Sequence, residues 1–195
     1  MKITVSPSSI LMLGVIIASG NLDKIILLLV ASSIHELGHI LCAKILSVKI
    51  IQLNLSIFGA TIKTNPLSCS YKKEAILAFT GPAFNLICAL IALLLMFFNS
   101  TLISDNLIGF TVVSLLLAFI NLLPIKNFDG GRILSCVLLR FFSPYLVFHI
   151  MDILSFLFVF ILWSFSVYLI LKIGVYLSLF IFSGALFSRI FLVVG

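Results

Sequence analysis

Apolar residues fill most of this chain in long runs, which short polar segments interrupt. A helix needs about 20 apolar residues to cross roughly 30 Å of hydrocarbon, and most of the runs approach or exceed this length. The runs occupy residues 10–19, 25–46, 75–98, 107–123, 145–171 and 173–194. This pattern predicts an all-α polytopic membrane protein with about six transmembrane helices, the first of them short.

The longest polar interval, residues 47–73, contains a pattern of another kind. Along residues 51–57 polar and apolar side chains alternate, which is the two-residue period of a strand with one polar and one apolar face. A turn at residues 58–60 would let residues 61–64 return as a partner strand. We therefore predict a small β-hairpin after the second helix.

Composition agrees with a membrane location. Hydrophobic residues make up 63% of the chain, charged residues only 9%, and the mean hydropathy is +1.36. These values lie far from those of an average soluble domain. No polar block is long enough for a second domain, so residues 1–195 are expected to form one domain in the cell membrane.

The basic residues predict the orientation of the chain, because short cytoplasmic loops collect lysine and arginine. A six-helix count places every basic residue except Lys24 and Lys172 on one side of the membrane. Both termini are therefore predicted to be cytoplasmic. The net charge of +6 is explained by topology, and we expect no nucleic-acid partner, which would need basic residues gathered on a soluble face.

Three ionisable residues, His35, Glu36 and His39, stand inside the second apolar run. A charged side chain at the bilayer centre costs roughly 2.5 to 3.5 kcal/mol, so chains that keep one usually use it. Histidines four residues apart share one helix face and can approach one metal ion. In this H-E-x-x-H arrangement, Glu36 would take a proton from water. The alternatives are a chance match and histidines that only bond neighbouring helices, and the burial cost argues against both.

A catalytic zinc needs three protein ligands, and the third is often a carboxylate. Among the six acids, Asp129 lies in the segment N-L-L-P-I-K-N-F-D-G-G-R, where proline and glycine interrupt an apolar run. Broken helix at membrane depth is tolerated where it lines protein or a water-filled cavity. We expect Asp129 as the third ligand. The pair His149 and Asp152, near a predicted helix start, is the alternative.

Three motifs carry a resemblance to a known family. H-E-L-G-H at 35–39, G-P-A-F-N at 81–85 and the segment at 121–132 resemble, in order and in helix position, the intramembrane metalloproteases of the site-2 protease family, M50. The small size and the lack of an inserted PDZ domain resemble the sporulation branch. The resemblance implies Zn²⁺ held by His35, His39 and Asp129, with Glu36 as general base.

The resemblance also implies that Asn85 and Asn121 lie near the site and hold substrate or line a water path. For Asn85, a hydrogen bond to a neighbouring helix, worth about 0.6 kcal/mol, is the alternative. Two departures stand out. Lys126 and Asn127 replace two prolines common in the family, so the loop before Asp129 is expected to be less rigid. Relatives of the sporulation branch often carry a CBS domain, which is not expected here.

The function implied is hydrolysis of a peptide bond in or near a transmembrane segment of a membrane-tethered protein, such as a sporulation sigma factor precursor released to the cytoplasm. The site would open towards the cytoplasm, where an edge of the hairpin that carries Asn54 would bind extended substrate. A plain connecting hairpin is the alternative. The sequence names neither the substrate, an inhibitory membrane partner nor the oligomeric state.

Two other functions were weighed. A metal-binding transporter would be expected to show inverted repeats, and none is visible. An inactive membrane scaffold would be expected to lack Glu36 or a ligand, and all are present.

Overall fold

The computed structural model of the chain describes most of its helical part and a small sheet. The described residues are 2–5, 22–48, 50–56, 59–64, 70–126, 128–173, 180, 183–184 and 186–187. The helices are α2 (Leu22–Ile45), α3 (Tyr71–Phe98), η1 (Ser100–Leu102), α4 (Asp105–Asn121), α5 (Asp129–Leu138) and α6 (Pro144–Ile173). The strands are β1 (Lys2–Val5), β2 (Ile50–Ser56) and β3 (Gly59–Thr64).

The helices match four of the predicted apolar runs. Within the described residues, Ile25–Ile45, Tyr71–Phe98 and Pro144–Lys172 are long and apolar enough to cross a membrane, and α4 is a shorter apolar helix. The runs predicted at 10–19 and 173–194 lie wholly or largely outside the described residues. The count of six transmembrane helices therefore stays a prediction.

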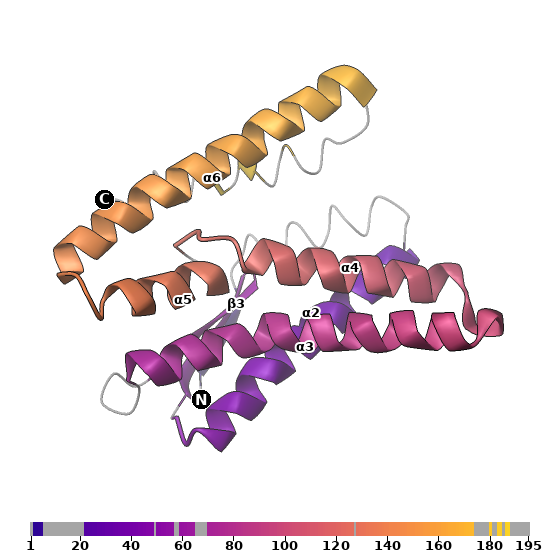
Figure 1. Cartoon of the computed structure of the whole chain (residues 1–195), viewed down its shortest axis with the longest axis horizontal. Helices are drawn as coiled ribbons and strands as arrows, with labels where there is room; N and C mark the ends of the chain where they lie inside the picture. The colour runs from indigo at the N-terminus through magenta and orange to yellow at the C-terminus, as the bar shows by residue number, and fades with distance from the viewer. Residues whose placement is uncertain are drawn as a thin grey trace.

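Helices α2, α3 and α4 pack together, and α3 and α4 run side by side (Figure 1). The packed faces carry small residues, which let helix backbones approach closely. Ala31 on α2, Ala89 on α3 and Ala118 on α4 are fully buried. Large apolar side chains such as Phe97 and Phe98 are instead about four-fifths exposed, at 81% and 80%. An apolar exterior over a small-residue interior is the arrangement expected in lipid.

Polar side chains set the ends of these helices. Ser70 caps α3 by accepting a hydrogen bond from the backbone N–H of Lys73, and Ser104 caps α4 in the same way through Leu107. Such caps satisfy donors that have no partner inside the helix. Helix α4 ends at Asn121, shortly before Pro124, which cannot continue a helix.

The sheet has the strand order β1-β2-β3. Strands β2 and β3 pair antiparallel, with Asn54 opposite Thr61, in the segment where the alternation predicts a hairpin. Strand β1 adds to the other edge of β2 in parallel, with Thr4 opposite Asn54. The sequence analysis did not predict β1, because four residues ahead of an apolar run give no period to detect. Consequently β2 is the central strand, and its backbone is paired on both sides.

The break predicted before Asp129 is present, and a short helix follows it. Residues 122–126 and Phe128 lie between α4 and α5, and Asp129 opens α5. Ile125 and Phe128 are buried against Val159 of α6, and the backbone N–H of Lys126 donates to Ser155 Oγ at 2.9 Å. The loop is therefore anchored on α6. The pattern of apolar runs did not predict α5 as a helix, because two glycines directly after Asp129 are typical of a loop.

The glycines after Asp129 are required for this close approach. A Cβ at Gly130 would collide with the carbonyl oxygen of Leu122, and a Cβ at Gly131 with that of Ile125. Both obstacles are backbone atoms, so a larger residue would push α5 away from the loop.

We predict that Gly130→Ala lowers the free energy of unfolding by about 1–3 kcal/mol, the usual cost of overpacking, and lowers the thermal midpoint by several degrees. Gly184→Ala is the matched control, because no described atom lies within 4 Å of the added Cβ. Alanine favours a helix over glycine, so this control should be neutral or slightly stabilising. Thermal unfolding of the purified chains in detergent measures both, and equal midpoints would refute the proposed crowding.

Candidate metal centre

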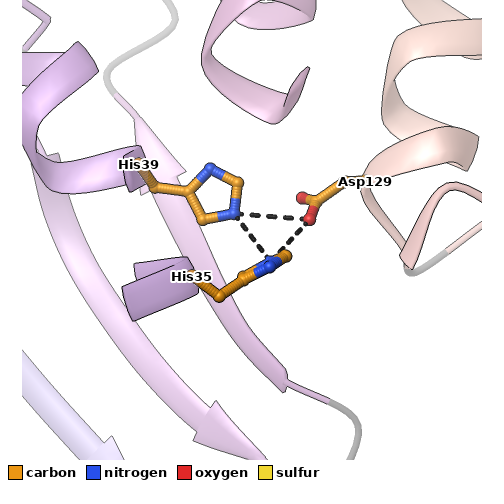
Figure 2. A group of neighbouring side chains, drawn as sticks. All are labelled: His35, His39 and Asp129. Carbon is orange, nitrogen blue, oxygen red and sulfur yellow. Dashed lines mark hydrogen bonds and ion pairs between the residues drawn. The ribbon is translucent and has the colours of Figure 1, made fainter. Parts of the chain in front are cut away.

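Two histidines of α2 and one aspartate of α5 meet in the interior (Figure 2). Asp129 Oδ2 lies 3.0 Å from His35 Nε2 and 3.3 Å from His39 Nε2, and the two Nε2 atoms are 3.2 Å apart. The three residues are 4%, 1% and 6% exposed. Within the described part of the chain, these three are the histidine, cysteine or acidic side chains that come close enough together to hold a metal ion.

The helical spacing of the two histidines produces their half of the cluster. Four residues apart on α2, the rings stand edge to face with centroids 4.8 Å apart. His39 Nδ1 lies 2.8 Å from the carbonyl oxygen of Leu77. A carbonyl only accepts, so this Nδ1 carries the proton, and Nε2 of the neutral ring keeps its lone pair. His39 is therefore held with its metal-binding atom facing the cluster.

Asp129 is oriented by charged neighbours on its other side. Its Oδ1 lies 3.7 Å from Nη1 of Arg132, one turn along α5, while Oδ2 faces the imidazoles. Nη2 of Arg132 in turn lies 3.5 Å from Oε1 of Glu74, near the start of α3. The ion pairs Glu74–Arg132 and Arg132–Asp129 thus link α3 to α5. One carboxylate oxygen of Asp129 faces Arg132, and the other faces the imidazoles.

The donor set fits a zinc ion. Zinc accepts imidazole nitrogen and carboxylate oxygen at about 2.0–2.2 Å, and tetrahedral ligands at that distance lie roughly 3.3 Å from one another. The observed separations are 3.0–3.3 Å. A Cβ at Gly81 of α3 would enter the space beside Nε2 of His39 and lie 2.7 Å from Nε2 of His35. The glycine of the G-P-A-F-N motif therefore keeps the metal-binding atoms uncovered.

The remaining predicted residues occupy different places. Glu36 follows His35 on α2 and is half-buried. Asn85 on α3 is fully buried, with its Nδ2 3.3 Å from His35 Nδ1. Asn121 is buried at the end of α4 and donates from Nδ2 to the carbonyl of Leu117. Asn54 lies in β2, and its side chain is outside what the structure describes.

The alternative third ligand lies apart from the cluster. Asp152 on α6 pairs with Lys126, with Oδ1 2.7 Å from Nζ. The ring of His149 packs against Tyr145, with centroids 4.4 Å apart. Of the two acids left open by the sequence, only Asp129 is brought to the histidines.

Sequence reasoning missed the residues that support the ligands. Arg132, Gly81 and the carbonyl of Leu77 each lie against a member of the cluster, and Glu74 pairs with Arg132. The only available signal was that Arg132 and Gly81 belong to the motifs already noted. Glu74 and Leu77 lie in α3, where nothing in the sequence distinguishes them.

Comparisons with known proteins agree with this geometry. Residues 24–108 match the model of peptidase family M50. The chain is 30% identical over 140 residues to stage IV sporulation protein FB of Bacillus subtilis (strain 168), a match that covers 69% of this chain and 46% of the relative. The chain thus spans about half the length of this curated relative.

A solved structure matches over nearly the whole chain. The site-2 protease from Methanocaldococcus jannaschii aligns with a TM-score of 0.69 at 25% identity, covering 96% of this chain and 88% of that one. The family match, the curated relative and the solved fold all point to the same group of proteins. Residues 24–108 of the chain are therefore similar to peptidase family M50, and the chain as a whole has the fold of a site-2 protease.

Proposed function

We propose that this chain is an intramembrane zinc protease that hydrolyses a peptide bond in or near a transmembrane segment of a membrane-tethered protein. The observation that carries the proposal is the buried His35–His39–Asp129 cluster among helices with an apolar exterior. Burying these groups in such surroundings is costly, and a bound metal ion would offset that cost.

In this proposal each residue has a separate task. His35, His39 and Asp129 hold the zinc ion, which when bound supplies Lewis acidity and lowers the pKa of water towards about 7. Glu36 takes a proton from the attacking water and passes it to the leaving amine. Its position directly after His35 on α2 supports this role. Asn121 and Asn54 are proposed to contact substrate, as the sequence predicts.

The substrate class follows from the family and from the lipid surroundings. We propose a regulatory precursor tethered to the membrane, of the sporulation sigma factor type, because the curated relative is named as a sporulation protein. The bias of lysine and arginine supports a site and both termini on the cytoplasmic side. The cleaved product would then be released into the cytoplasm.

The sheet offers a way to present the substrate in extended form. A helical segment cannot be cut easily, because its carbonyls are already hydrogen-bonded, whereas an added strand exposes them. Strand β2, which carries Asn54, is paired on both sides, so strand addition would use an outer edge of the sheet, and we propose that of β3, which belongs to the predicted hairpin. This changes the predicted role of Asn54, which could contact substrate only through its side chain.

The two other functions find less support. A metal transporter needs a second ligand set along a path, and within the described residues only one cluster of this kind is found. An inactive scaffold would have no need to keep Glu36 in the H-E-x-x-H motif or to bring His35, His39 and Asp129 together.

We predict that Glu36→Gln abolishes cleavage while zinc binding persists, because the amide cannot accept the proton and the ligands are unchanged. The loss should be at least about 10²–10⁴-fold. Co-expression with a panel of tagged membrane-tethered transcription factor precursors measures cleavage, and metal analysis of the purified chain measures zinc. Cleavage that survives in Glu36→Gln would show that Glu36 is not the base.

We predict that Asp129→Asn weakens zinc binding more than the roughly 10–100-fold that loss of an outer partner costs, because a charged ligand is removed. Asp152→Asn is the matched control, since Asp152 pairs with Lys126 and not with the histidines. Zinc affinity of both proteins is measured by competition with a chelator. If Asp152→Asn causes the greater loss, the third ligand has been assigned to the wrong acid.

We predict that a cysteine at Thr61 of β3 forms disulfide cross-links with cysteines placed along the cleaved segment of the substrate, at every second position, as strand pairing requires. A cysteine at Phe97, near the far end of α3 and 81% exposed, is the control and should not cross-link. Cross-linking is followed on gels in the Glu36→Gln background, which prevents cleavage. If the cysteine in β3 forms no cross-link at any substrate position, the hairpin does not bind substrate and only connects α2 to α3.

A further inference from the structure

Asn85 is buried beside one metal ligand with half of its carboxamide unsatisfied. It is 0% exposed and lies on α3 one turn after Gly81. Its Nδ2 is 3.3 Å from Nδ1 of His35. Its Oδ1 is buried and has no hydrogen-bond partner among the described residues. An unsatisfied buried carbonyl costs about 1–3 kcal/mol, so this arrangement calls for an explanation.

The position of the proton on His35 explains why Nδ2 of Asn85, and not Oδ1, faces the ring. An amide N–H can only donate, so with Nδ2 facing the ring, Nδ1 of His35 is the acceptor and Nε2 carries the proton. That Nε2–H then donates to Asp129 Oδ2 at 3.0 Å.

Metal binding reverses the requirement at His35. Nε2 must then offer its lone pair, so the proton moves to Nδ1, which needs an acceptor. A rotation of the Asn85 carboxamide by 180° exchanges two ends of almost equal size and brings Oδ1 to Nδ1. His39 needs no such adjustment, because the Leu77 carbonyl holds its proton on Nδ1 in both cases.

We propose that Asn85 is a positioning residue for His35, whose carboxamide turns over when the metal binds so that Oδ1 accepts the proton of Nδ1, and that it thereby sets the zinc affinity of the site. This inference rests on the proposed function, since it concerns the same metal. It assigns Asn85 a task towards a ligand, whereas the sequence analysis predicted contact with substrate.

The test measures zinc affinity of the full-length chain in detergent, without substrate, by competition with a chromophoric chelator. Asn85→Leu removes the acceptor at similar volume and should weaken zinc binding about 10–100-fold. Asn85→Asp keeps an acceptor at both ends and should bind zinc at least as tightly as the parent chain. Thr111→Val is the matched control, because it removes a buried hydroxyl that bonds within α4, and it should leave zinc affinity unchanged.

The outcomes separate the possible roles of Asn85. If folded Asn85→Leu binds zinc as the parent does, the proposal is overturned, and a rise in KM alone would assign Asn85 to substrate. If Asn85→Asp weakens zinc binding tenfold or more, an acceptor is not what His35 requires, and the proposal is again overturned. Should Asn85→Leu fail to fold in thermal unfolding, Asn85→Ala removes the same acceptor and is judged by the same criterion. A parent chain that binds no zinc would instead remove the proposed function itself.

Discussion

The contact of Asp129 with His35 and His39 joins residues about ninety positions apart in the chain, and much of the surrounding structure serves it. Ionisable groups in an apolar interior are stable only when other groups satisfy them. The two imidazoles and the carboxylate do so for one another, and a metal ion between them would do so better. The site therefore needs α2 and α5 held at a fixed separation.

That separation depends on backbone approach at a few small residues. Gly81 lets α3 pass directly beside the two Nε2 atoms, and the glycines after Asp129 let α5 fold back on the preceding loop. The loop is tied to α6 through Ser155 and through the buried Phe128. Helix α6 thus helps to position Asp129 although none of its own residues belongs to the cluster. Lys126, which stands where relatives are expected to have proline, contributes an ion pair with Asp152 to the same attachment.

The ligands differ in how firmly their outer atoms are held. His39 is fixed by a backbone carbonyl, which can only accept, and Asp129 is flanked by an arginine that is itself held by Glu74. His35 faces an amide, which offers either a donor or an acceptor. Two side chains of the cluster are thus held in one orientation, and the third faces a group that can pair with either form of its ring.

The apolar runs, the pairing of His35 with His39 and the break before Asp129 were readable from the sequence, because each depends on local spacing or on residues that interrupt a helix. The described helices α2, α3, α4 and α6 lie where the runs predict them. The short helix α5 was missed because its first turn contains two glycines, whose use becomes visible only against the loop they touch. Strand β1 was missed because its partner lies about fifty residues away.

Local spacing in the sequence also could not decide whether Asp129 or Asp152 joins the two histidines. Both acids are compatible with a site near the break, and only the packing of α5 against α3 and of α6 against the loop brings one to the histidines and the other to Lys126. Likewise, the motif around Asn85 gave its helix but not the direction of its side chain. The chemical groups that are available, and the helices that carry them, can be predicted from the sequence, because helical period and hydrophobicity are local properties. Tertiary structure decided which of them meet, because contacts between helices depend on packing that uniformly apolar runs do not encode in their period.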